Sequence, residues 1–587
     1  MITLGLIDTK PSTAAVLDDG EIMSAVAEER LCRWKLAGGM PRAAIDHALS
    51  IAGIPAAAID GVVVAQNTAP WQPEPVPFSG WFDDPTRRRS RFLRLGAELA
   101  PWVGRFSPSR RAHHRLKSWV HRERRHRLPA SLAAGHGITA PVRFVDHHDA
   151  HAASAYGTCD LEPCLVVTLD GGGDGRSGSV AIGRGGRLEP VASVDSYHSL
   201  GNVYSYVTEL CGFRAEKHEG KITGLAALGT PRFADILRRF VRYAHPGRIR
   251  YGVAMYHRSA LRRLRAALPA DFEPLRDRAD LAASVQLVLE EVAIGFVRHW
   301  LQRTGLRHLA VAGGVFANVK LNQRLVEMPE IDRLWVHPAM DDGGLAVGGA
   351  LLAAMDRPDP LARKRRLPDV YLGPDVEDGH RDVTAGVADA RARGFVVERF
   401  SDPNALAEAI AGHLADGRTV ARCTGRMEYG PRALGHRSVL HRADDPTIHD
   451  RLNRQLRRTE FMPFAPATLA EHATERYRRL DVAADAARFM TVTFEVTERL
   501  RAESPAAVHV DGTARPQIVD GDTAPDLHRL LSAYHRRTGV PTVLNTSFNL
   551  HEEPIVATAD DAVRAFVEAD LDVLALGEHL IRRPTEG

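Results

Sequence analysis

The chain has 587 residues and a formal net charge of +3, with 44% hydrophobic and 25% charged residues. These values are those of an ordinary soluble protein, and so small a net charge by itself indicates no nucleic-acid partner. A chain of this length exceeds what one hydrophobic core usually organises, so we expect two or more domains.

Cysteine use indicates a reducing compartment. The cysteines are odd in number, scattered and without the paired spacing of a zinc site: Cys32, Cys159, Cys164, Cys211 and Cys423. The first residues, "MITLGLIDTKPSTAAVL", show no basic leader before an apolar stretch, and no run of eighteen apolar residues occurs anywhere. We therefore expect a cytoplasmic protein with no membrane partner.

In chain order, "ITLGLID" and "TAAVLDDGEIMSAVAEER" predict a strand hairpin followed by a helix. Further apolar runs, "IDGVVVA", "CLVVTLD", "HLAVAGG" and "RLWVHPA", alternate with helical segments and indicate an α/β fold. No internal repeat is visible, although both halves of this region are rich in strands. The polar, proline-bearing stretch 356–378 predicts a linker, and a second α/β unit follows it.

An arginine-rich segment, 87–127, contains fourteen Arg or Lys residues and two Glu, with Trp102 and Trp119 among them. Clustered arginine with aromatic residues binds RNA or phosphate in other proteins. A solvated helical insertion with a few apolar anchors explains this segment better than binding of RNA or phosphate does. A third interpretation is that the segment covers an acceptor site.

Histidines and aspartates concentrate in "VDHHDAHAASAYGTCDLEPCLVVTLDGGGDG", which begins at Val145. His147 and His151 are four residues apart, so on a helix both rings project from one face, and the alanines favour that helix. Asp170 ends an apolar strand before a glycine turn, and Asp342 stands in a similar place in "HPAMDDGGLAVGGAL". These four residues predict a site for iron(II), manganese or zinc with positions left for phosphate oxygens, and His148 lies on the other side of the helix.

Glycine segments predict the rest of a nucleotide cleft. In "AVAGGVFANVKLNQRL", Gly313 and Gly314 stand between a strand and a helix, where they allow close approach of a nucleoside and where helix-start amides favour anionic oxygen. Tight packing would explain the pair equally well. We expect Asn318 to hydrogen-bond the nucleoside, and Gly171, Gly172 and Gly343 to line the same cleft.

Ten stretches of the sequence resemble one family. They are "AVAEERLCRWKLAGGMPRAAI", "DHHDAHAASA", "LDGGGDG", "SLGNVYSYVTELCGF", "EGKITGLAALG", "GGVFANVKLNQRL", "EYGPRALGHRSVL", "FMPFAPATL", "HVDGTARPQ" and "LNTSFNLHEEPIV". In this order they are similar to the O-carbamoyltransferase family, which includes the nodulation-factor and cephamycin carbamoyltransferases and nebramycin synthase. The stretches span nearly the whole chain.

The resemblance implies two catalytic domains. Residues 1–365, with the arginine-rich insertion at about 68–129, would form an actin-like (ASKHA) ATPase domain similar to tRNA threonylcarbamoyltransferases. It would bind ATP and hold iron through His147, His151, Asp170 and Asp342. Residues 366–587 would form a domain similar to threonylcarbamoyl-adenylate synthases and take carbamoyl phosphate. The family makes carbamoyl-adenylate from carbamoyl phosphate and ATP and passes the carbamoyl group to a hydroxyl of a small molecule.

Several residues fit that division of labour. Arg432 and Arg437 lie five apart in a loop shaped by glycine and proline, where their forked donors could converge on one phosphate. The expected carbamoyl phosphate pocket is completed by Arg458, Arg515, Asn545, Thr546 and Ser547. We expect the metal, with Lys35 or Lys221, to neutralise the leaving adenylate.

The sequence departs from the family at three places. The family carries a His-Asp pair in the first hairpin, its proposed base for the acceptor hydroxyl, and "DTKPSTAA" has Lys10 or Pro11 there. A lysine with its ordinary pKa of about 10.4 is a poor base at neutral pH, so the open alternatives are Asp8 as base, another route for the proton, or loss of transfer activity. Glu552 stands where glycine is common, and Thr459 where an acid is usual.

Other classes of protein explain fewer of these features. An actin-like small-molecule kinase leaves the arginines of the second domain without a use, and no "HExxH" supports a metalloprotease. An RNA-modifying carbamoyl-type transferase remains an alternative, because tRNA enzymes share the fold, and it would bind tRNA. A carbamoyltransferase would exchange pyrophosphate into ATP in the presence of carbamoyl phosphate. A non-catalytic binding protein would do neither. We expect ATP, carbamoyl phosphate and a hydroxyl acceptor as small-molecule partners. We also expect a divalent metal, with magnesium as a further candidate ion. The expected role is natural-product tailoring, for example in antibiotic biosynthesis, or glycan modification. The sequence is compatible with a homodimer and argues against a nucleic-acid partner.

Overall fold

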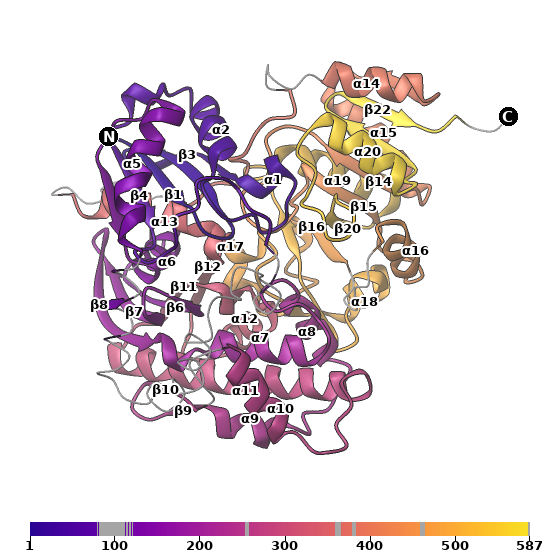
Figure 1. The fold of residues 1–587 in the computed structure, drawn as a ribbon. Helices are drawn as coiled ribbons and strands as arrows, with labels where there is room; N and C mark the ends of the chain where they lie inside the picture. The colour runs from indigo at the N-terminus through magenta and orange to yellow at the C-terminus, as the bar shows by residue number, and fades with distance from the viewer. Residues whose placement is uncertain are drawn as a thin grey trace. The chain divides into compact units, whose positions relative to one another are not determined.

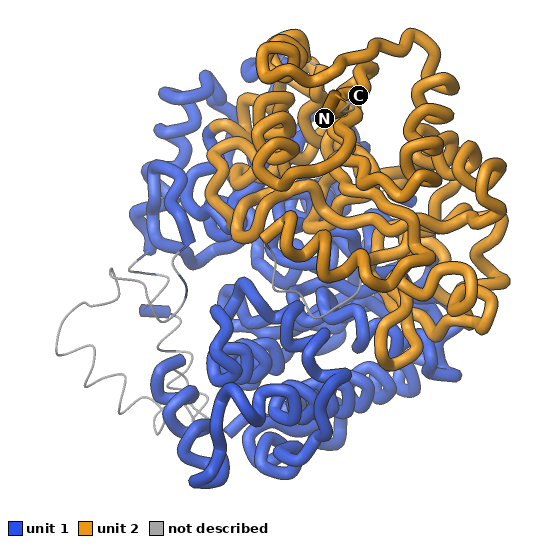
Figure 2. Tube along the Cα trace, turned by 90° about the vertical axis from the view of Figure 1, so that its right-hand side faces the viewer, with its two compact units in different colours: residues 1–21, 36–42, 54–366 blue, residues 22–35, 43–53, 367–587 orange. Residues whose placement is uncertain are grey.

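The computed structural model describes residues 1–78, 80, 112, 115–116, 119, 121–252, 257–357, 366–377, 383–457 and 464–584. They fall into two compact units, coloured separately in Figure 2. Unit 1 comprises residues 1–21, 36–42 and 54–366, and unit 2 comprises residues 22–35, 43–53 and 367–587. Element labels are those of Figure 1.

Unit 1 contains two larger sheets and one hairpin. Its strands are β1 (Ile2–Ile7), β2 (Thr13–Asp18), β4 (Gly61–Ala65), β5 (Val142–Val145), β6 (Cys164–Gly173), β7 (Arg176–Arg184), β8 (Arg187–Asp195), β9 (Val241–Ala244), β10 (Arg248–Tyr251), β11 (His308–Ala312) and β12 (Arg333–Val336). The apolar runs that predicted strands are β4, β6, β11 and β12, so the α/β prediction is confirmed there.

The two larger sheets repeat one topology. In the first, β1 pairs antiparallel with β2 and parallel with β4, and β4 pairs parallel with β5. In the second, β6 pairs antiparallel with β7 and parallel with β11, and β11 pairs parallel with β12. The order β2-β1-β4-β5 therefore corresponds to β7-β6-β11-β12, with β8 added beside β7. The sequence showed no repeat, and that interpretation was wrong: the repeat lies in topology and not in residue identity.

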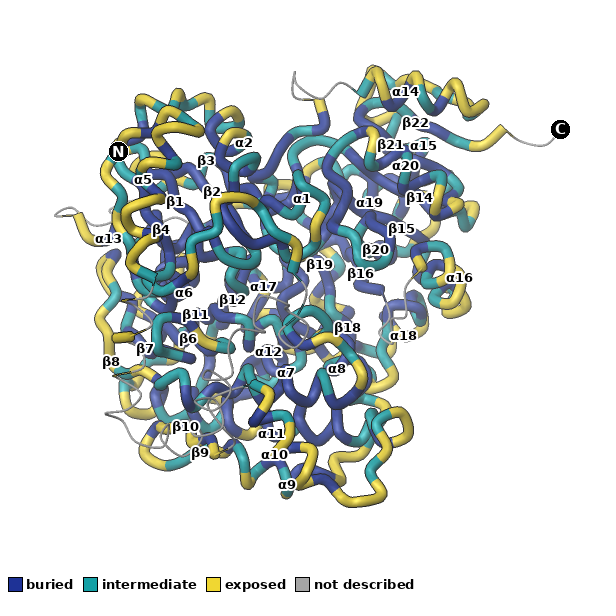
Figure 3. Tube along the Cα trace, viewed as in Figure 1, coloured by how far each residue is buried: buried dark blue, intermediate teal, exposed yellow. Residues whose placement is uncertain are grey.

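Two helices separate the sheets of unit 1. Helix α13 (Leu345–Met355) packs on β1, β2 and β4, while α6 (His147–Gly157) packs on β6, β7 and β11, and the two helices contact each other. A Cβ at Gly348 would come within 2.0 Å of the Ala150 carbonyl oxygen, so the helix crossing requires glycine. Paired sheets around a central helix pair are the arrangement of actin-like ATPases, as the resemblance implied. Figure 3 shows this interior in dark blue.

The remaining helices of unit 1 surround the second sheet and extend beyond it. Helices α7 and α11 pack on β6. The helices are α5 (Arg122–His136), α7 (Leu200–Leu210), α8 (Glu219–Ala226), α9 (Ala234–Phe240), α10 (His257–Ala267), α11 (Pro274–Thr304) and α12 (Val319–Val326).

Unit 2 is built on one eight-stranded mixed sheet in the order β13-β22-β21-β14-β15-β20-β16-β19. Its strands are β13 (Val396–Arg399), β14 (Val420–Cys423), β15 (Arg437–Arg442), β16 (Ala465–Leu469), β19 (Gln517–Val519), β20 (Thr542–Ser547), β21 (Val573–Leu576) and β22 (His579–Arg582). A two-stranded sheet joins β17 (Phe494–Glu495) and β18 (Thr513–Ala514). Strand β3 (Glu21–Ala27) belongs to unit 2 from Ile22 onward.

Apolar cores on both faces make unit 2 a three-layer α/β structure. One core contains residues of α14 (Val383–Ala392) and α20 (Ala559–Glu568), and the other contains residues of α15 (Pro403–Ala415) and α19 (Pro525–Thr538). The other helices of unit 2 are α1 (Glu28–Cys32), α2 (Arg42–Ala52, of which Arg42 is assigned to unit 1), α16 (Ile448–Gln455), α17 (Ala484–Ala487) and α18 (Glu498–Glu503).

None of the five cysteines forms a disulfide bond. Within the described ranges, every helix is too short or too polar to serve as a membrane span.

Candidate metal centre

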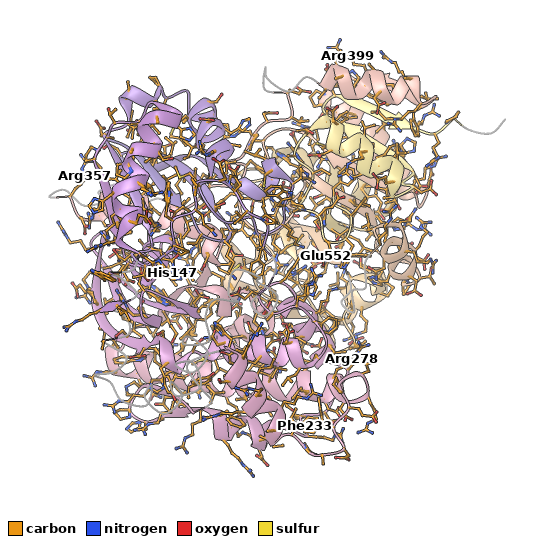
Figure 4. All side chains as sticks on the ribbon, in the orientation of Figure 1. His147, Phe233, Arg278, Arg357, Arg399 and Glu552 are labelled. Atoms are coloured by element: carbon orange, nitrogen blue, oxygen red, sulfur yellow. The ribbon has the colours of Figure 1, made fainter. Side chains whose placement is uncertain are left out.

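Helix α6 positions two of the predicted metal ligands. Asp146 caps its first turn by accepting hydrogen bonds from the backbone N–H groups of His148 (2.8 Å) and Asp149 (3.4 Å). The alanines that follow let the helix pass between the two sheets, and nearly all of its residues are buried. His147 (labelled in Figure 4) and His151 therefore stand one turn apart on one buried face, with ring centres 4.7 Å apart.

Asp170 is presented by an irregularity in β6. The pairing of β6 with β7 is regular up to Leu169 and shifts register between Leu169 and Gly173. Such bulges turn a side chain away from the direction that regular pleating would give it. The Asp170 carboxylate accepts hydrogen bonds from the backbone N–H groups of Gly171 (2.6 Å) and Gly314 (3.3 Å), which hold it in place.

Asp342 begins a short 3₁₀ turn, Asp342–Gly344, between β12 and α13. The neighbouring Asp341 caps that turn by accepting from the Gly343 N–H at 3.0 Å. The helix-start glycines therefore form the turn that carries the fourth predicted ligand.

The four side chains meet at one point in unit 1. His147 Nε2 lies 3.0 Å from Asp170 Oδ2 and 3.5 Å from Asp342 Oδ1. His151 Nε2 lies 3.6 and 3.4 Å from the same two oxygens. One potential ligand atom from each residue falls within 4.8 Å of all the others. The sequence stretch that combined these residue types thus folds into a single cluster.

The contacts of His151 test whether the cluster fits a metal. This ring is completely buried, and neither of its nitrogens makes a hydrogen bond. Its Nε2 points at two carboxylate oxygens from distances too long for strong hydrogen bonds, which is what ligands around a shared cation do. Two imidazoles and two carboxylates suit iron(II), manganese or zinc, so the residues fit a divalent ion.

The pKa shifts of the cluster residues also fit a site for a cation. Burial lowers the pKa of His147, but the carboxylates of Asp342, Asp170 and Asp174 outweigh it and raise the pKa to about 9. Burial also lowers the pKa of His151, and the nearby carboxylates of Asp170 and Asp342 raise it above its ordinary value. Burial raises the pKa of Asp170, yet His147 and His151 hold it well below its usual range. In the metal-free protein, protons supply the positive charge that the carboxylates require.

One side of the cluster is open to solvent. The histidines are 2% and 0% exposed, whereas the side chains of Asp170 and Asp342 are 14% and 28% exposed. An oxygen ligand from a substrate therefore has an approach on the carboxylate side.

Residues beyond the ligands fix the start of α6. Asp174 accepts from the His147 N–H (3.1 Å) and from the N–H groups of Asn67 (2.7 Å) and Thr68 (2.8 Å). Arg176 pairs with Asp146 at 2.9 Å. Asp174 was not singled out from the sequence, although it lies in the "LDGGGDG" stretch that also holds Asp170.

His148 has a structural role. Its Nδ1 lies 2.8 Å from the Thr168 hydroxyl, and it is completely buried on the other side of α6. Burial, followed by the neighbouring His147 and His151, lowers its pKa well below the ordinary value, so the ring is neutral.

The predicted nucleotide-binding glycines lie around the metal cluster. A Cβ at Gly313 would come within 2.3 Å of the Leu169 carbonyl oxygen, and one at Gly314 within 2.9 Å of Asp170 Oδ1. Gly171 and Gly172 belong to the β6 bulge, and Gly343 to the Asp342 turn. Close packing accounts for Gly313 and Gly314, and the same contacts bring backbone amides to the cluster.

Asn318 is placed differently from the expectation. Its side-chain oxygen caps α12 by accepting from the Leu321 N–H at 2.9 Å. Its amide nitrogen donates to Gln286 Oε1 at 2.7 Å and contacts Thr223 at 3.4 Å. These bonds occupy the polar atoms expected to bind a nucleoside, because strand-to-helix turns use asparagine as an N-cap.

The two candidate bases of the first hairpin are both in ion pairs. Asp8 is buried and receives two hydrogen bonds from Arg124, one of them from Nε at 2.8 Å. Lys10 pairs with Glu216, and its ammonium lies 3.9 Å from the centre of the Phe78 ring. Arg124 belongs to the arginine-rich segment, so at least one of those arginines is a buried structural residue. Most of that segment lies outside the described residues.

The two other predicted lysines lie in different units. Lys221 is a buried residue of α8 in unit 1, 5.7 Å from the centre of the Phe213 ring. Lys35 is half-buried in unit 2.

In unit 2, a buried glutamate supports the "RMEYGPRALGHRS" loop. Glu428 accepts hydrogen bonds from the backbone N–H groups of Leu434 (2.7 Å), His436 (2.9 Å) and Arg437 (3.1 Å). The sequence interpretation missed this residue, because nothing in one sequence shows which loop amides a carboxylate will reach.

Two predicted phosphate ligands serve the same loop. Arg437 is fully buried and donates to the carbonyl oxygens of Thr424 (2.5 Å) and Gly425 (3.0 Å). Asn545 donates to Gln517 Oε1 at 2.7 Å and contacts the Ala433 carbonyl at 3.4 Å. These contacts make both residues part of the loop's support.

The other members of the predicted carbamoyl phosphate pocket are partly exposed. Arg432, Arg515, Thr546 and Ser547 are all half-buried. The Ser547 hydroxyl donates to Asn549 Oδ1 at 2.6 Å. Arg458 and Thr459 lie outside the described residues. Glu552, labelled in Figure 4, has a φ of 68°, a conformation that favours the glycine common in the family.

Fold and site together define a two-unit α/β protein with a buried His₂Asp₂ centre in an actin-like scaffold. The Carbamoyltransferase N-terminus family model matches residues 3–351, and the Carbamoyltransferase C-terminus model matches residues 411–583. The chain belongs to the carbamoyltransferase family and is a transferase enzyme.

Curated relatives agree with the family models. The nodulation protein NolNO of Sinorhizobium fredii is 32% identical over 586 residues, covering 97% of this chain and 79% of its own length. The nodulation protein NolO of Bradyrhizobium diazoefficiens is 35% identical over 444 residues, covering 75% of this chain and 79% of its own length.

Solved structures are only distantly similar. Component A of (R)-2-hydroxyglutaryl-CoA dehydratase from Acidaminococcus fermentans has a TM-score of 0.33 at 15% identity, covering 60% of this chain and 98% of its own. Full-length HypF in its phosphate- and nucleotide-bound form has a TM-score of 0.29 at 12% identity, covering 61% of this chain and 56% of its own. Scores this low carry no functional weight, and the family assignment rests on the sequence comparisons.

Proposed function

We propose that the protein is an ATP-dependent O-carbamoyltransferase that forms carbamoyl-adenylate and passes its carbamoyl group to a hydroxyl of a small molecule. The observation that carries the proposal is the His147, His151, Asp170 and Asp342 cluster in a member of the carbamoyltransferase family. The first reaction consumes carbamoyl phosphate, ATP and water and yields carbamoyl-adenylate, phosphate and pyrophosphate. In the second, the acceptor oxygen bonds to the carbamoyl carbon, AMP leaves, and the hydroxyl proton is lost.

The cluster residues suit the binding of a phosphorylated substrate. A divalent ion held there, for which we propose iron(II) with manganese and zinc as the alternatives, would neutralise phosphate charge and act as a Lewis acid. Asp170 and Asp342 leave a solvent-accessible side for oxygen ligands. Backbone N–H groups of Gly171 and Gly314 hold the Asp170 carboxylate, so its position does not depend on the substrate.

The proton of the acceptor hydroxyl needs a route that does not use Asp8. Both oxygens of the Asp8 carboxylate accept hydrogen bonds from Arg124 in a buried pair, so Asp8 is a structural residue. The Lys10 ammonium is paired with Glu216. We assign Lys10 and Lys221 of unit 1 the role of cations that neutralise the adenylate, with Lys35 of unit 2 as a third.

Unit 2 is proposed to bind carbamoyl phosphate through the loop that Glu428 supports. In this proposal Arg432, Arg458, Arg515, Thr546 and Ser547 contact the phosphate, whereas Arg437 and Asn545 keep the loop in shape. Two forked guanidinium groups bind phosphate more strongly and with more geometric selectivity than lysines would.

The decisive measurement is mass spectrometry of the purified protein incubated with ATP, carbamoyl phosphate and iron(II). The expected product without acceptor is carbamoyl-adenylate, released with pyrophosphate. Formation of ADP in place of AMP derivatives would instead indicate an actin-like kinase. Steeply salt-dependent tRNA binding together with absence of the adenylate would favour the RNA-modifying alternative.

A further inference from the structure

A pocket of about 460 Å³ lies in unit 1, apart from the residues assigned above. Its walls come from the end of β8, the 3₁₀ turn Ser196–His198 and the β9–β10 hairpin. Pockets of roughly 300–1,000 Å³ are the size that holds small molecules. The lining includes Asp195, Tyr197, His198, Arg248, Arg250 and Tyr251.

The hairpin presents three arginines on one face. Arg250 pairs across the strands with Arg242, and Arg248 lies two residues from Arg250, so all three side chains leave the same side of the hairpin. All three are exposed, while Val241, Ile249 and Tyr251 on the opposite face are buried. Like charges directly opposite each other in a hairpin are unfavourable unless something of opposite charge stabilises them.

No protein carboxylate among the described residues supplies that charge. None of these three arginine side chains has a hydrogen bond or an ion pair in the described part of the chain. Exposed arginines close by in sequence behave differently: Arg232 pairs with Asp280 and Arg238 with Glu291.

The other polar groups of the pocket suit a hydroxylated ligand. His198 Nδ1 accepts from the Tyr251 N–H at 3.3 Å, so the neutral ring carries its proton on Nε2 as a donor. Asp195 accepts from the Tyr197 N–H at 2.9 Å. The Tyr197 and Tyr251 rings are buried and pack edge to face, with centres 5.8 Å apart, on the side of the hairpin opposite the arginines.

The pocket is connected to the metal centre through the turn that forms its wall. Ser199, one residue after His198, donates from its hydroxyl to the Asp170 carbonyl oxygen at 3.1 Å. The Ser196 N–H donates to the Gly175 carbonyl in the β6–β7 turn at 2.9 Å. A Cβ at Gly172 would contact Ser196 at 3.6 Å. The same wall thus packs on the strand bulge that presents the metal ligand.

We infer that this pocket is the acceptor subsite and that it holds an anionic group, a phosphate or carboxylate, carried by a hydroxylated acceptor of about monosaccharide size. Arg248 and Arg250 pair with the anion, and Arg242 adds to the positive field. The inference rests on the proposed carbamoyl transfer for the identity of the ligand as acceptor. A pocket of about 460 Å³ favours a small molecule over a nucleic acid, which needs an extended basic surface.

Calorimetric titration with glucose 6-phosphate tests the subsite, using glucose as the uncharged probe. The full-length protein is saturated with ATP and kept without carbamoyl phosphate, so that the nucleotide site is filled and no adenylate forms; binding that survives in Arg248→Ala/Arg250→Ala belongs to the proposed carbamoyl phosphate pocket of unit 2. We expect saturable binding of glucose 6-phosphate and none of glucose. Arg248→Ala and Arg250→Ala should each weaken binding about tenfold, because each removes a charge-assisted hydrogen bond.

Two further variants control the experiment. Arg265→Ala removes an exposed arginine of α10 that has no partner in the described part of the chain, and binding should stay unchanged. Arg248→Lys/Arg250→Lys keeps the charge without the forked donors and should bind between the wild type and the double alanine variant. Equal affinity of the wild type and the double alanine variant, or no binding by the wild type, would overturn the inference.

Adenylate formation without acceptor is measured on the same protein preparations after carbamoyl phosphate and iron(II) are added. Its absence from the wild type defeats the proposed function, independently of the titration. Adenylate formation that persists in the double alanine variant, with sugar phosphate binding lost, supports the subsite. Binding of oligouridylate that depends on Arg248 and Arg250, with no sugar phosphate binding, assigns the hairpin to nucleic acid and overturns the inference.

Discussion

The metal cluster of unit 1 and the Glu428 loop of unit 2 compensate their buried charges in opposite ways. In the cluster, His147 and His151 face Asp170 and Asp342 at distances that leave room for a cation. In the loop, Glu428 accepts three backbone hydrogen bonds. The cluster opposes its carboxylates with ionisable side chains, whereas the loop opposes Glu428 with backbone N–H groups at Oε1 and leaves Oε2 without a hydrogen bond among the described residues. A carboxylate that faces imidazoles suits a shared cation, whereas one that accepts from backbone N–H groups stabilises a loop.

The comparison predicts its largest effect for His151→Ala. Removal of one of four ligands should weaken divalent-metal binding by more than about a hundredfold, since changes at residues that only support ligands already cost 10–100-fold. Metal content after dialysis, measured by mass spectrometry, checks this. His148→Ala is the matched control, because His148 is on the same helix and bonds to Thr168 outside the cluster. Full metal content in His151→Ala would remove the ion from the mechanism.

Glu428→Ala tests the loop. It leaves three buried backbone N–H groups without their acceptor, so we expect a loss of about 3 kcal/mol in the stability of unit 2. Thermal unfolding should show this, and carbamoyl-adenylate formation should fall while metal content stays the same. Glu498→Ala, at a side chain 88% exposed, should change neither quantity. Metal loss in Glu428→Ala would mean that the two regions are not independent.

The sequence was enough to find the metal cluster but not the groups that support it. The i, i+4 histidines and the aspartates beside glycine turns follow rules that one sequence displays, although Asp170 lies at a bulge inside β6 and not at the end of the strand. Asp174, Arg124 and Glu428 act through backbone amides or partners far along the chain, and those contacts depend on the tertiary fold. Asn318 has an N-cap role that its sequence position shares with a nucleoside ligand, because both uses require the same residue at the same turn.

The topological repeat of unit 1 escaped detection for a related reason. β1 and β6 occupy equivalent places in their sheets, yet β1 is regular and β6 carries Asp170 on a bulge. Equivalent strands need only share burial and pairing, so their residues diverge while the topology persists. The apolar runs still predicted the strands themselves correctly.

The affinity of the cluster for a divalent metal should depend on pH. His147 has its pKa raised to about 9 in the metal-free protein, so a metal must displace a proton below that pH. Affinity for manganese should therefore rise up to tenfold per pH unit from pH 7 to 9 for each proton displaced, as chelator competition can measure. A flat profile over that range would show that the histidines do not hold the protons assigned to them.

The same shift has a stability consequence. Because the folded-state pKa lies above the ordinary value of 6.5, the contribution of His147 to the stability of the metal-free protein is complete below pH 6.5 and is lost as the pH rises through about 9. The metal-loaded protein should not show this loss, since the ion replaces the proton. Thermal unfolding of both forms at pH 6.5 and 9 compares them directly.

The smallest predicted effect concerns backbone strain in unit 2 and not charge. Glu552 has a φ of 68°, a left-handed conformation that costs a residue with a side chain roughly 1–2 kcal/mol. Glu552→Gly removes that strain, but the greater freedom of glycine in the unfolded chain costs about 0.4–1 kcal/mol of stability. We therefore expect a net increase of about 0.5–1 kcal/mol in the free energy of unfolding. Glu552→Ala keeps the strain and removes the carboxylate, which lies 3.5 Å from His551, so its stability should stay close to that of the wild type. Thermal unfolding of the three proteins separates the two causes: if the glycine and alanine variants are equally stable, then the charge and not the backbone distinguishes this position from the family's glycine.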